Sequence, residues 1–340
     1  MTEPVSLDVQ TRRTRIFARH PNLVAFGILT AVLIALPLVL RNNYQISILN
    51  FIGLNTILTV GLALLMGYAG QVSLGHAVFY GLGGYGVGIL AQRTGLPPLA
   101  AIVGAAIITG LIALLIGIPL LRLRGYYLAV ATLGLNVIFL LIATNETELT
   151  GGPNGLAIPG DLTIGGFTFD SDLKFYFLIW LVTLALIAVS LNIVNSRIGR
   201  ALRAIDSSEI AAETLGVNTA RLKLQTLVLS AMYASIAGSL YAYWIGIVSP
   251  SDFSINFSIE LVVMVAIGGL ASVWGAIFGA AVVTLLIELL RNFLPQVLSG
   301  ASGEHQIVAF GILLIFIMIL MPEGLTAGSL KRLRAWRKKT

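Results

Sequence analysis

Ten long apolar stretches, separated by short polar or glycine-rich segments, account for most of the chain. A membrane-spanning helix needs about 20 mostly apolar residues, because the hydrocarbon core of a bilayer is about 30 Å thick. The stretches that reach or approach this length are 22–40, 46–66, 77–91, 98–119, 126–143, 175–194, 224–247, 259–270, 273–290 and 306–321. Two of them, 77–91 and 259–270, are short and interrupted by glycine, which indicates half-helices or tilted segments. The pattern predicts an all-α, polytopic transmembrane helical bundle with broken helices and about ten spans, in a range of about 8 to 12.

The composition agrees with a chain surrounded mainly by lipid. Hydrophobic residues make up 57% and charged residues 11%, with a mean hydropathy of +0.93. Ordinary soluble domains carry about 25% charged residues, so the 36 charged side chains here are too few to cover one soluble globule. The chain has no cysteine, which excludes disulfides, thiolate metal sites and a catalytic cysteine.

The positions of the cations predict an orientation, because Lys and Arg collect in cytoplasmic loops. With a cytoplasmic N-terminus and ten spans, 17 of the 21 Lys and Arg residues fall on the cytoplasmic side. We therefore expect a basic cytoplasmic N-terminus (1–21), a transmembrane domain (22–321) and a basic cytoplasmic tail (322–340). A lipid-surface anchor explains this tail better than nucleic-acid binding. The first span lacks a small-residue cleavage pattern behind it, so we expect it to be retained.

Two polar segments are longer than simple turns. The segment 144–174, expected outside the cytoplasm, is acidic and rich in turn-forming glycine; it is either a docking surface for a soluble partner or a solvated loop. The segment 195–223 is expected in the cytoplasm. Asp206 or Ser207 can cap a short helix there, and Gly216 can end it.

That short cytoplasmic helix would carry an apolar face formed by Ile210, Ala211 and Leu215. The small pair Ala211–Ala212 suits close approach by another surface. The segment is either a plain amphipathic connector or a lever that a second protein grips.

Sequence motifs for catalysis and cofactor binding are missing. The GLGGYG string at 81–86 fits a dinucleotide pattern, but it lies inside an apolar stretch with no preceding strand, and close helix packing explains it better. No GxxxxGKS or GxxxxGKT string occurs, so any ATP hydrolysis must take place on another chain. The three histidines do not pair at metal-ligand spacing. We expect no catalytic residue, no metal, no cofactor and no enzymatic activity.

A glycine-rich interruption at 67–75 separates two apolar stretches and predicts a broken helix. A break in lipid frees backbone groups, which is tolerated where the segment is buried in protein or lines a wet cavity. Transporters build substrate sites from such discontinuous helices. We therefore predict a substrate path near Asn55, Tyr68, Gln71, Ser73 and His76; the alternative is a short cytoplasmic turn. A second glycine-rich break at 268–275 raises the possibility of a weak internal repeat.

Two acidic residues fall inside apolar stretches, where ionisable groups are costly and usually functional. Glu288 precedes Arg291 by three residues, a spacing that favours a structural ion pair on a helix. Glu260 lies near the outer end of its span and either faces a polar path or reaches interfacial water. Both are the coupling candidates if the chain is an ion-driven carrier.

Several segments in order resemble a known family. Residues 67–77 read GYAGQVSLGHA, 151–156 read GGPNGL, 197–205 read RIGRALRAI, 209–216 read EIAAETLG and 322–325 read PEGL. Together with Gly268–Gly269, these resemble the LivM-type permease of branched-chain amino-acid ABC importers over roughly residues 55–325. The resemblance implies that 209–216 matches the loop by which such permeases dock onto their ATPases. It assigns that coupling role to Glu209, Ala211, Ala212 and Gly216, although the usual continuation toward a Leu-Pro pair is replaced here by Leu222-Lys223-Leu224-Gln225.

The resemblance also implies a set of partners and a location. These are a second, LivH-type permease, two cytoplasmic ATPase subunits, a periplasmic substrate-binding protein and the bilayer of a bacterial inner membrane. The expected function is ATP-driven translocation of branched-chain or hydrophobic amino acids. The scarcity of intramembrane charge fits a zwitterionic substrate but fits urea or a short amide equally, so an amide permease remains an alternative. A self-sufficient channel or ion-coupled carrier is the alternative from another class.

Overall fold

The computed structural model describes residues 21–40, 42–123, 125–297, 308 and 311–312. Nearly all of the basic N-terminus, most of the expected span 306–321 and all of the basic tail lie outside the described residues. The chain divides into two compact units, residues 1–46 and 47–340. The first unit contains the apolar helix α2 (Pro21–Val39) and the beginning of α3.

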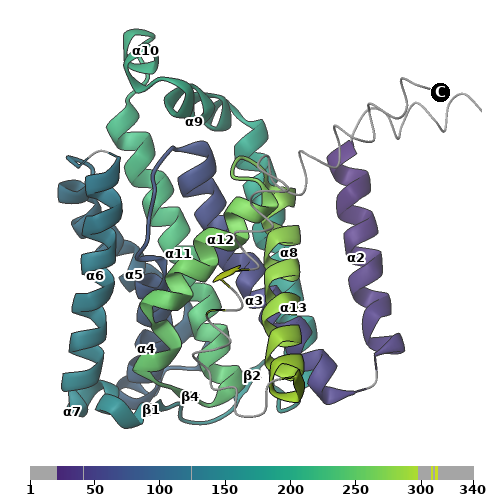
Figure 1. The fold of residues 1–340 in the computed structure, drawn as a ribbon. Coiled ribbons are helices and arrows are strands. Elements are labelled where there is room, and N and C mark those ends of the chain that lie inside the picture. Colours follow the sequence, from purple (N-terminus) through teal and green to yellow (C-terminus); the bar gives the residue numbers. More distant parts are fainter. Residues whose placement is uncertain (1–20, 41, 124, 298–307, 309–310, 313–340) are drawn as a thin grey trace, which may run out of the picture. The chain divides into compact units, whose positions relative to one another are not determined.

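The second unit is built almost entirely from helices (Figure 1). They are α3 (Asn43–Ala63), its continuation as the π-helix η1 (Leu64–Tyr68), α4 (His76–Thr94), α5 (Pro98–Leu120), α6 (Tyr126–Asn145), α7 (Thr147–Thr150), η2 (Gly152–Asn154), α8 (Asp172–Asn195), α9 (Arg197–Ser207), α10 (Glu209–Thr214), α11 (Thr219–Ile245), η3 (Pro250–Phe253), α12 (Ile255–Gly268) and α13 (Val273–Val297).

Nine of the ten predicted spans coincide with a helix of the described chain, and the tenth, 306–321, lies outside it. Seven helical segments in the described part are long and apolar enough to cross a membrane. The prediction of an all-α polytopic membrane bundle is confirmed. The stretch expected at 77–91 is one unbroken 19-residue helix, whereas α12 has only 14 residues and follows η3.

The helix α3 forms the centre of the second unit. In its most apolar window 83% of the residues are buried, against 28% in α6 and in α8. Buried hydroxyls on α3 bond to the backbone one turn back, as Thr56 Oγ1 does to the Ile52 carbonyl at 2.7 Å. The peripheral helices α5, α6 and α8 therefore keep broad apolar surfaces for lipid or a partner.

Small residues let α4 and α11 approach closely. A Cβ at Gly238 of α11 would lie 1.9 Å from the Tyr80 carbonyl oxygen of α4. The Ser239 hydroxyl donates to the Gly83 carbonyl at 3.1 Å across the same contact. The glycine-rich string at 81–86 thus lies within α4 and serves close helix packing. This agrees with the sequence analysis, which favoured helix packing over dinucleotide binding.

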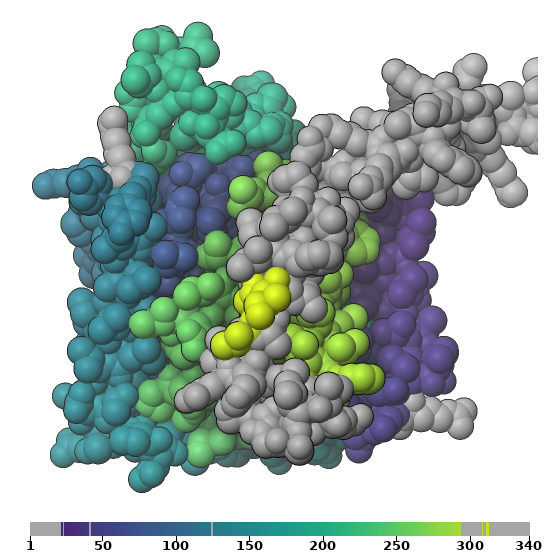
Figure 2. Space-filling model, in the orientation of Figure 1, coloured from purple at the N-terminus to yellow at the C-terminus, as the bar shows by residue number. Residues whose placement is uncertain are grey.

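The two ends of the second unit differ in structure and charge. α9 and α10 lie at one end and project beyond the long helices (Figures 1 and 2). α7 and the strands β1 (Leu156–Ala157) and β4 (Ile247–Val248) lie at the other end (Figure 1). Six described cations belong to the α9–α10 end: Arg122, Arg197, Arg200, Arg203, Arg221 and Lys223. This asymmetry is the one on which the predicted orientation rests.

The segment 144–174 is folded at the opposite end. β1 pairs antiparallel with β4, and β2 (Leu162–Ile164) forms a hairpin with β3 (Phe167–Phe169). Leu162 is fully buried, and β2 packs on α5. The segment is therefore a structured cover rather than a solvated loop throughout.

Candidate functional site

The first glycine-rich break is held open by side chains from other helices. η1 ends at Tyr68, and regular helix resumes at His76. The Leu74 amide donates to Thr132 Oγ1 of α6 at 3.0 Å, and the Ala77 amide donates to Ser258 Oγ of α12 at 3.1 Å. Backbone groups freed by a broken helix must find such partners in an apolar surrounding. The predicted break is confirmed, and Thr132 and Ser258, isolated polar residues in apolar stretches, are the supports that sequence reasoning missed.

The second break lies directly against the first. α12 ends at Gly268 and α13 begins at Val273, with Gly269 at φ +107°. A Cβ at Gly67 in η1 would lie 1.6 Å from the Leu270 carbonyl oxygen. Two segments about 200 residues apart in sequence therefore form one irregular backbone junction inside the second unit.

The five predicted path residues do not gather in one cavity. Gln71 and Ser73 line a pocket of only about 20 Å³ with Thr132. Tyr68 is buried, and His76 is fully buried, with both ring nitrogens lacking a hydrogen-bond partner among the described residues. Asn55 lies elsewhere and donates from Nδ2 to Thr284 Oγ1 of α13 at 2.9 Å.

Asn55 lines a larger cavity, of about 260 Å³, between α3, α4, α11, α12 and α13. Its other polar and charged lining includes Tyr80, Glu260, Glu288 and Arg291. The expected ion pair between Glu288 and Arg291 is not formed. Instead, Glu288 Oε1 accepts a hydrogen bond from Asn292 Nδ2 at 3.2 Å. The sequence had singled out Asn55, Glu260, Glu288 and Arg291, whereas Tyr80 was hidden among the aromatic residues of an apolar stretch.

The segment 195–223 folds into two helices, α9 and α10, rather than one. Ser208 caps α10 by accepting from the Ala211 amide at 3.3 Å, so the expected cap at Asp206 or Ser207 is wrong. Both of those residues belong to α9. Gly216, with φ +82°, follows α10 as predicted, because a left-handed residue after a helix favours glycine.

The coupling residues assigned by resemblance have different environments on α10. Glu209 is fixed to Lys223 of α11 by an ion pair of 2.6 Å. Ala211 is exposed, but Ala212 is only 1% exposed and packs inside the loop. The exposed apolar surface here is formed instead by Ile210 of α10 and by Leu215 directly after the helix, which are 72% and 81% exposed.

α9 connects this surface to the first break. Asp206 Oδ1 lies 3.2 Å from the position of a Cβ at Gly70, and α9 packs on η1. Arg203 Nη1 donates to the Val194 carbonyl at the end of α8 at 3.1 Å. α9 therefore rests on the irregular backbone at 67–75.

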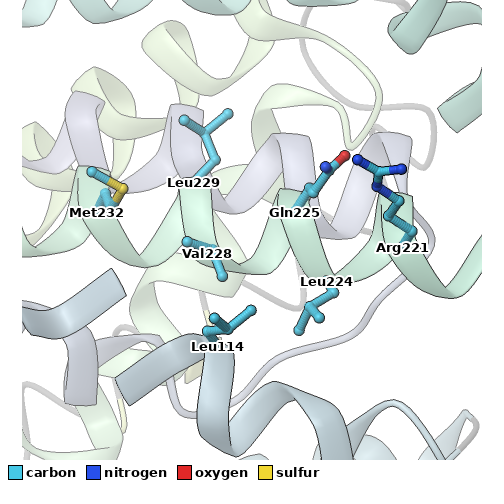
Figure 3. A pocket seen from close by; sticks show the side chains of 7 residues that line it. All are labelled: Leu114, Arg221, Leu224, Gln225, Val228, Leu229 and Met232. Atoms are coloured by element: carbon cyan, nitrogen blue, oxygen red, sulfur yellow. The ribbon is translucent and has the colours of Figure 1, made fainter. Parts of the chain in front are cut away.

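A separate groove of about 450 Å³ runs along α11 and meets α5 at Leu114 (Figure 3). Leu224, Val228 and Met232 make most of it apolar, and Arg221 and Gln225 lie together at one end. Such a surface suits lipid chains or a neighbouring helix.

Comparisons with known proteins give one consistent result. The family model described as branched-chain amino acid transport system, permease component, matches residues 44–321. The chain is 33% identical over 327 residues to the high-affinity branched-chain amino acid transport system permease protein LivM of Salmonella typhimurium, covering 87% of this chain and 73% of that protein. It is 33% identical over 312 residues to LivM of Escherichia coli, covering 85% and 71%.

The chain is also similar to LivH, the other permease protein of that name series. It is 28% identical over 290 residues to LivH of Escherichia coli, covering 79% of this chain and 90% of that protein. No solved structure matches the chain significantly.

Proposed function

The chain belongs to the family of branched-chain amino acid transport system permease components, and on this basis we propose that it carries branched-chain and other hydrophobic amino acids across the inner membrane. In this proposal ATP is hydrolysed on two cytoplasmic partner subunits. A periplasmic binding protein delivers the substrate. Both termini and the α9–α10 end face the cytoplasm.

The surface of α10 is the observation that carries the coupling role. Two large apolar side chains, Ile210 and Leu215, are exposed at the tip of a short, capped helix. Exposing these side chains to water is unfavourable. Burial against a docked partner would stabilise the complex by about 1.5–3 kcal/mol per side chain. The short helix is held rigidly by the Glu209–Lys223 pair and by Thr219, whose hydroxyl donates to Glu213 Oε1 at 2.7 Å. A rigid helix transmits force better than a flexible turn.

A second permease completes the translocation path in this proposal. The similarity of the chain to both LivM and LivH supports a pair of related subunits. α6 is mostly unburied in this chain and exposes Ile138, Leu141 and Ile142, so it offers one surface for that subunit. The cavity between two such subunits would alternate its opening as the ATPases close and separate.

The docking surface can be tested in proteoliposomes that contain the complete importer. The double variant Ile210→Asp/Leu215→Asp should insert normally but lose at least about tenfold in uptake and in binding-protein-stimulated ATP hydrolysis, because both apolar contacts are lost. Ile210→Leu/Leu215→Met is the matched control and should retain both activities. Normal uptake by the aspartate variant would remove the docking assignment.

A charge reversal at Glu209 is a weaker test of docking. Glu209→Lys would place two ammonium groups where the structure has a 2.6 Å ion pair, so it would disturb the loop itself. Gly216→Pro would likewise disturb the loop, since proline cannot adopt φ +82°. Both variants should reduce coupling, but only the α10 surface variants separate docking from loop stability.

A further inference from the structure

The 260 Å³ cavity contains chemistry that coupling to ATPases does not require. It brings carboxylates, a guanidinium and aromatic rings to one place inside a predominantly apolar bundle. Ionisable groups in such surroundings are costly unless something compensates their charge.

Several polar groups of the cavity have internal partners. Asn55 bonds to Thr284, and Asp252 Oδ2 accepts from the Ser249 amide at 2.9 Å, where it helps to cap η3. Glu288 accepts from Asn292. These groups are part of the wall and are not available in full to a ligand.

Two other groups lack such partners in the described part of the chain. Tyr80 is only 4% exposed, and its hydroxyl makes no hydrogen bond to a described residue. Glu260 lies in the second turn of α12. Its carboxylate forms no ion pair or hydrogen bond with a described residue. Both side chains line the cavity.

Aromatic rings surround this part of the cavity. The Tyr80 ring lies 5.4 Å from Phe257 and 5.6 Å from Tyr241, and Tyr241 lies 6.4 Å from Phe51. All four rings line the cavity. Ring faces attract a desolvated ammonium and also offer apolar contact area to an aliphatic side chain.

Resting on the proposed function, we propose that this cavity is a transient binding site for a zwitterionic amino acid with an apolar side chain. Glu260 binds the ammonium group, with the Tyr80 hydroxyl beside it. Arg291, which lines the same cavity, binds the carboxylate. The rings and Met264 contact the aliphatic side chain. The permease itself thus selects a zwitterion, which disfavours urea and neutral amides as its cargo.

The inference is tested first by uptake through the reconstituted complete importer. Glu260→Gln should lower leucine uptake tenfold or more while the ATP hydrolysis stimulated by the loaded binding protein and the thermal midpoint stay near wild type. Asp161→Asn, in the exposed loop before β2, is the matched control for loss of one negative charge and should transport normally. Wild-type uptake by Glu260→Gln would overturn the inference. A Glu260→Gln variant that loses uptake, has a lowered thermal midpoint and keeps the wild-type ligand preference in the next measurement would overturn it as well.

The second measurement reads the cavity without the binding protein. Saturation-transfer NMR on the purified complex compares leucine, isopentylamine, 4-methylpentanoate and isovaleramide. We expect the strongest signal for leucine and the weakest for the amide, loss of the amine signal in Glu260→Gln, and loss of the carboxylate signal in Arg291→Gln. Equal signals for leucine and isovaleramide in the wild type would overturn the site. A wild-type importer that fails to transport leucine at all would instead refute the proposed function, while this ligand ranking could still be measured.

Discussion

The contact between the two backbone breaks gives the most direct test of the structure. In a Gly67→Ala variant the new Cβ would lie 1.6 Å from the Leu270 carbonyl oxygen and 2.3 Å from its carbon. A relaxed C···O contact is about 3.3–3.6 Å, so the two segments would have to separate by about 2 Å. The obstacle is backbone rather than a flexible side chain, so rotation of a side chain cannot relieve it.

Such overpacking costs about 1–3 kcal/mol or more. Each kcal/mol shifts the thermal midpoint by about 2–4 °C in chains of 150–250 residues, so we expect a decrease of about 2–12 °C. Intrinsic tryptophan fluorescence of the detergent-purified protein during heating measures it. Gly134→Ala is the control, because a Cβ there meets nothing within 4 Å and alanine favours a helix. Equal midpoints for the two variants would refute the contact between the breaks.

Substitutions at two further residues test the contacts around the junction. Thr132→Val removes the acceptor for the Leu74 amide and should lower the free energy of unfolding by about 1–3 kcal/mol, measured by thermal unfolding. Thr132→Ser keeps the hydroxyl and should retain most of the wild-type stability. Equal destabilisation by both variants would contradict the role of that hydrogen bond. Burial raises the pKa of Asp206 above its ordinary value, so ionised Asp206 weakens the folded state once the pH exceeds about 4. Asp206→Asn should therefore match or slightly exceed the wild-type midpoint at pH 7, and the difference should close as the pH falls through about 4; a large loss confined to pH 7 would contradict this sign.

The spans could be predicted because the bilayer imposes one length and one polarity on every crossing element. The break at 67–75 could be predicted because its three glycines stand beside the polar residues Gln71 and Ser73. Glycine alone does not break a helix here, since the glycine-rich but apolar string at 81–86 stays helical within α4. What sequence reasoning could not supply was the partner of each freed amide. Thr132 and Ser258 lie 58 and 181 residues from the groups they satisfy, and nothing local in the sequence joins them.

The same limit on prediction from local sequence applies to the candidate site. The sequence correctly predicted that Gly216 follows the short helix, but it placed the N-cap one or two residues early. Asp206, Ser207 and Ser208 are all capping residue types, and packing decides among them. Ala211 and Ala212 look equivalent in sequence, yet one is exposed and the other buried. Of the five predicted path residues, only Asn55 lines the large cavity. Gln71 and Ser73 line a much smaller pocket, and Tyr68 and His76 are buried.

The contacts also indicate how motion at α10 would reach the cavity. α10 continues from α9, and α9 rests on η1 and Gly70. η1 touches Leu270 through Gly67, and Leu270 lies between the end of α12 and the start of α13. α12 carries Glu260, and α13 carries Thr284 and Arg291, so the helices that leave the junction are two walls of the cavity. A displacement of α9 by about one ångström cannot be absorbed at Gly67, where backbone meets backbone, and it must therefore reappear as a tilt of α12 or α13. If this is how the importer works, Gly67→Ala should reduce uptake more than its loss of stability explains, because it fixes the junction in a separated arrangement even when α10 is free to move.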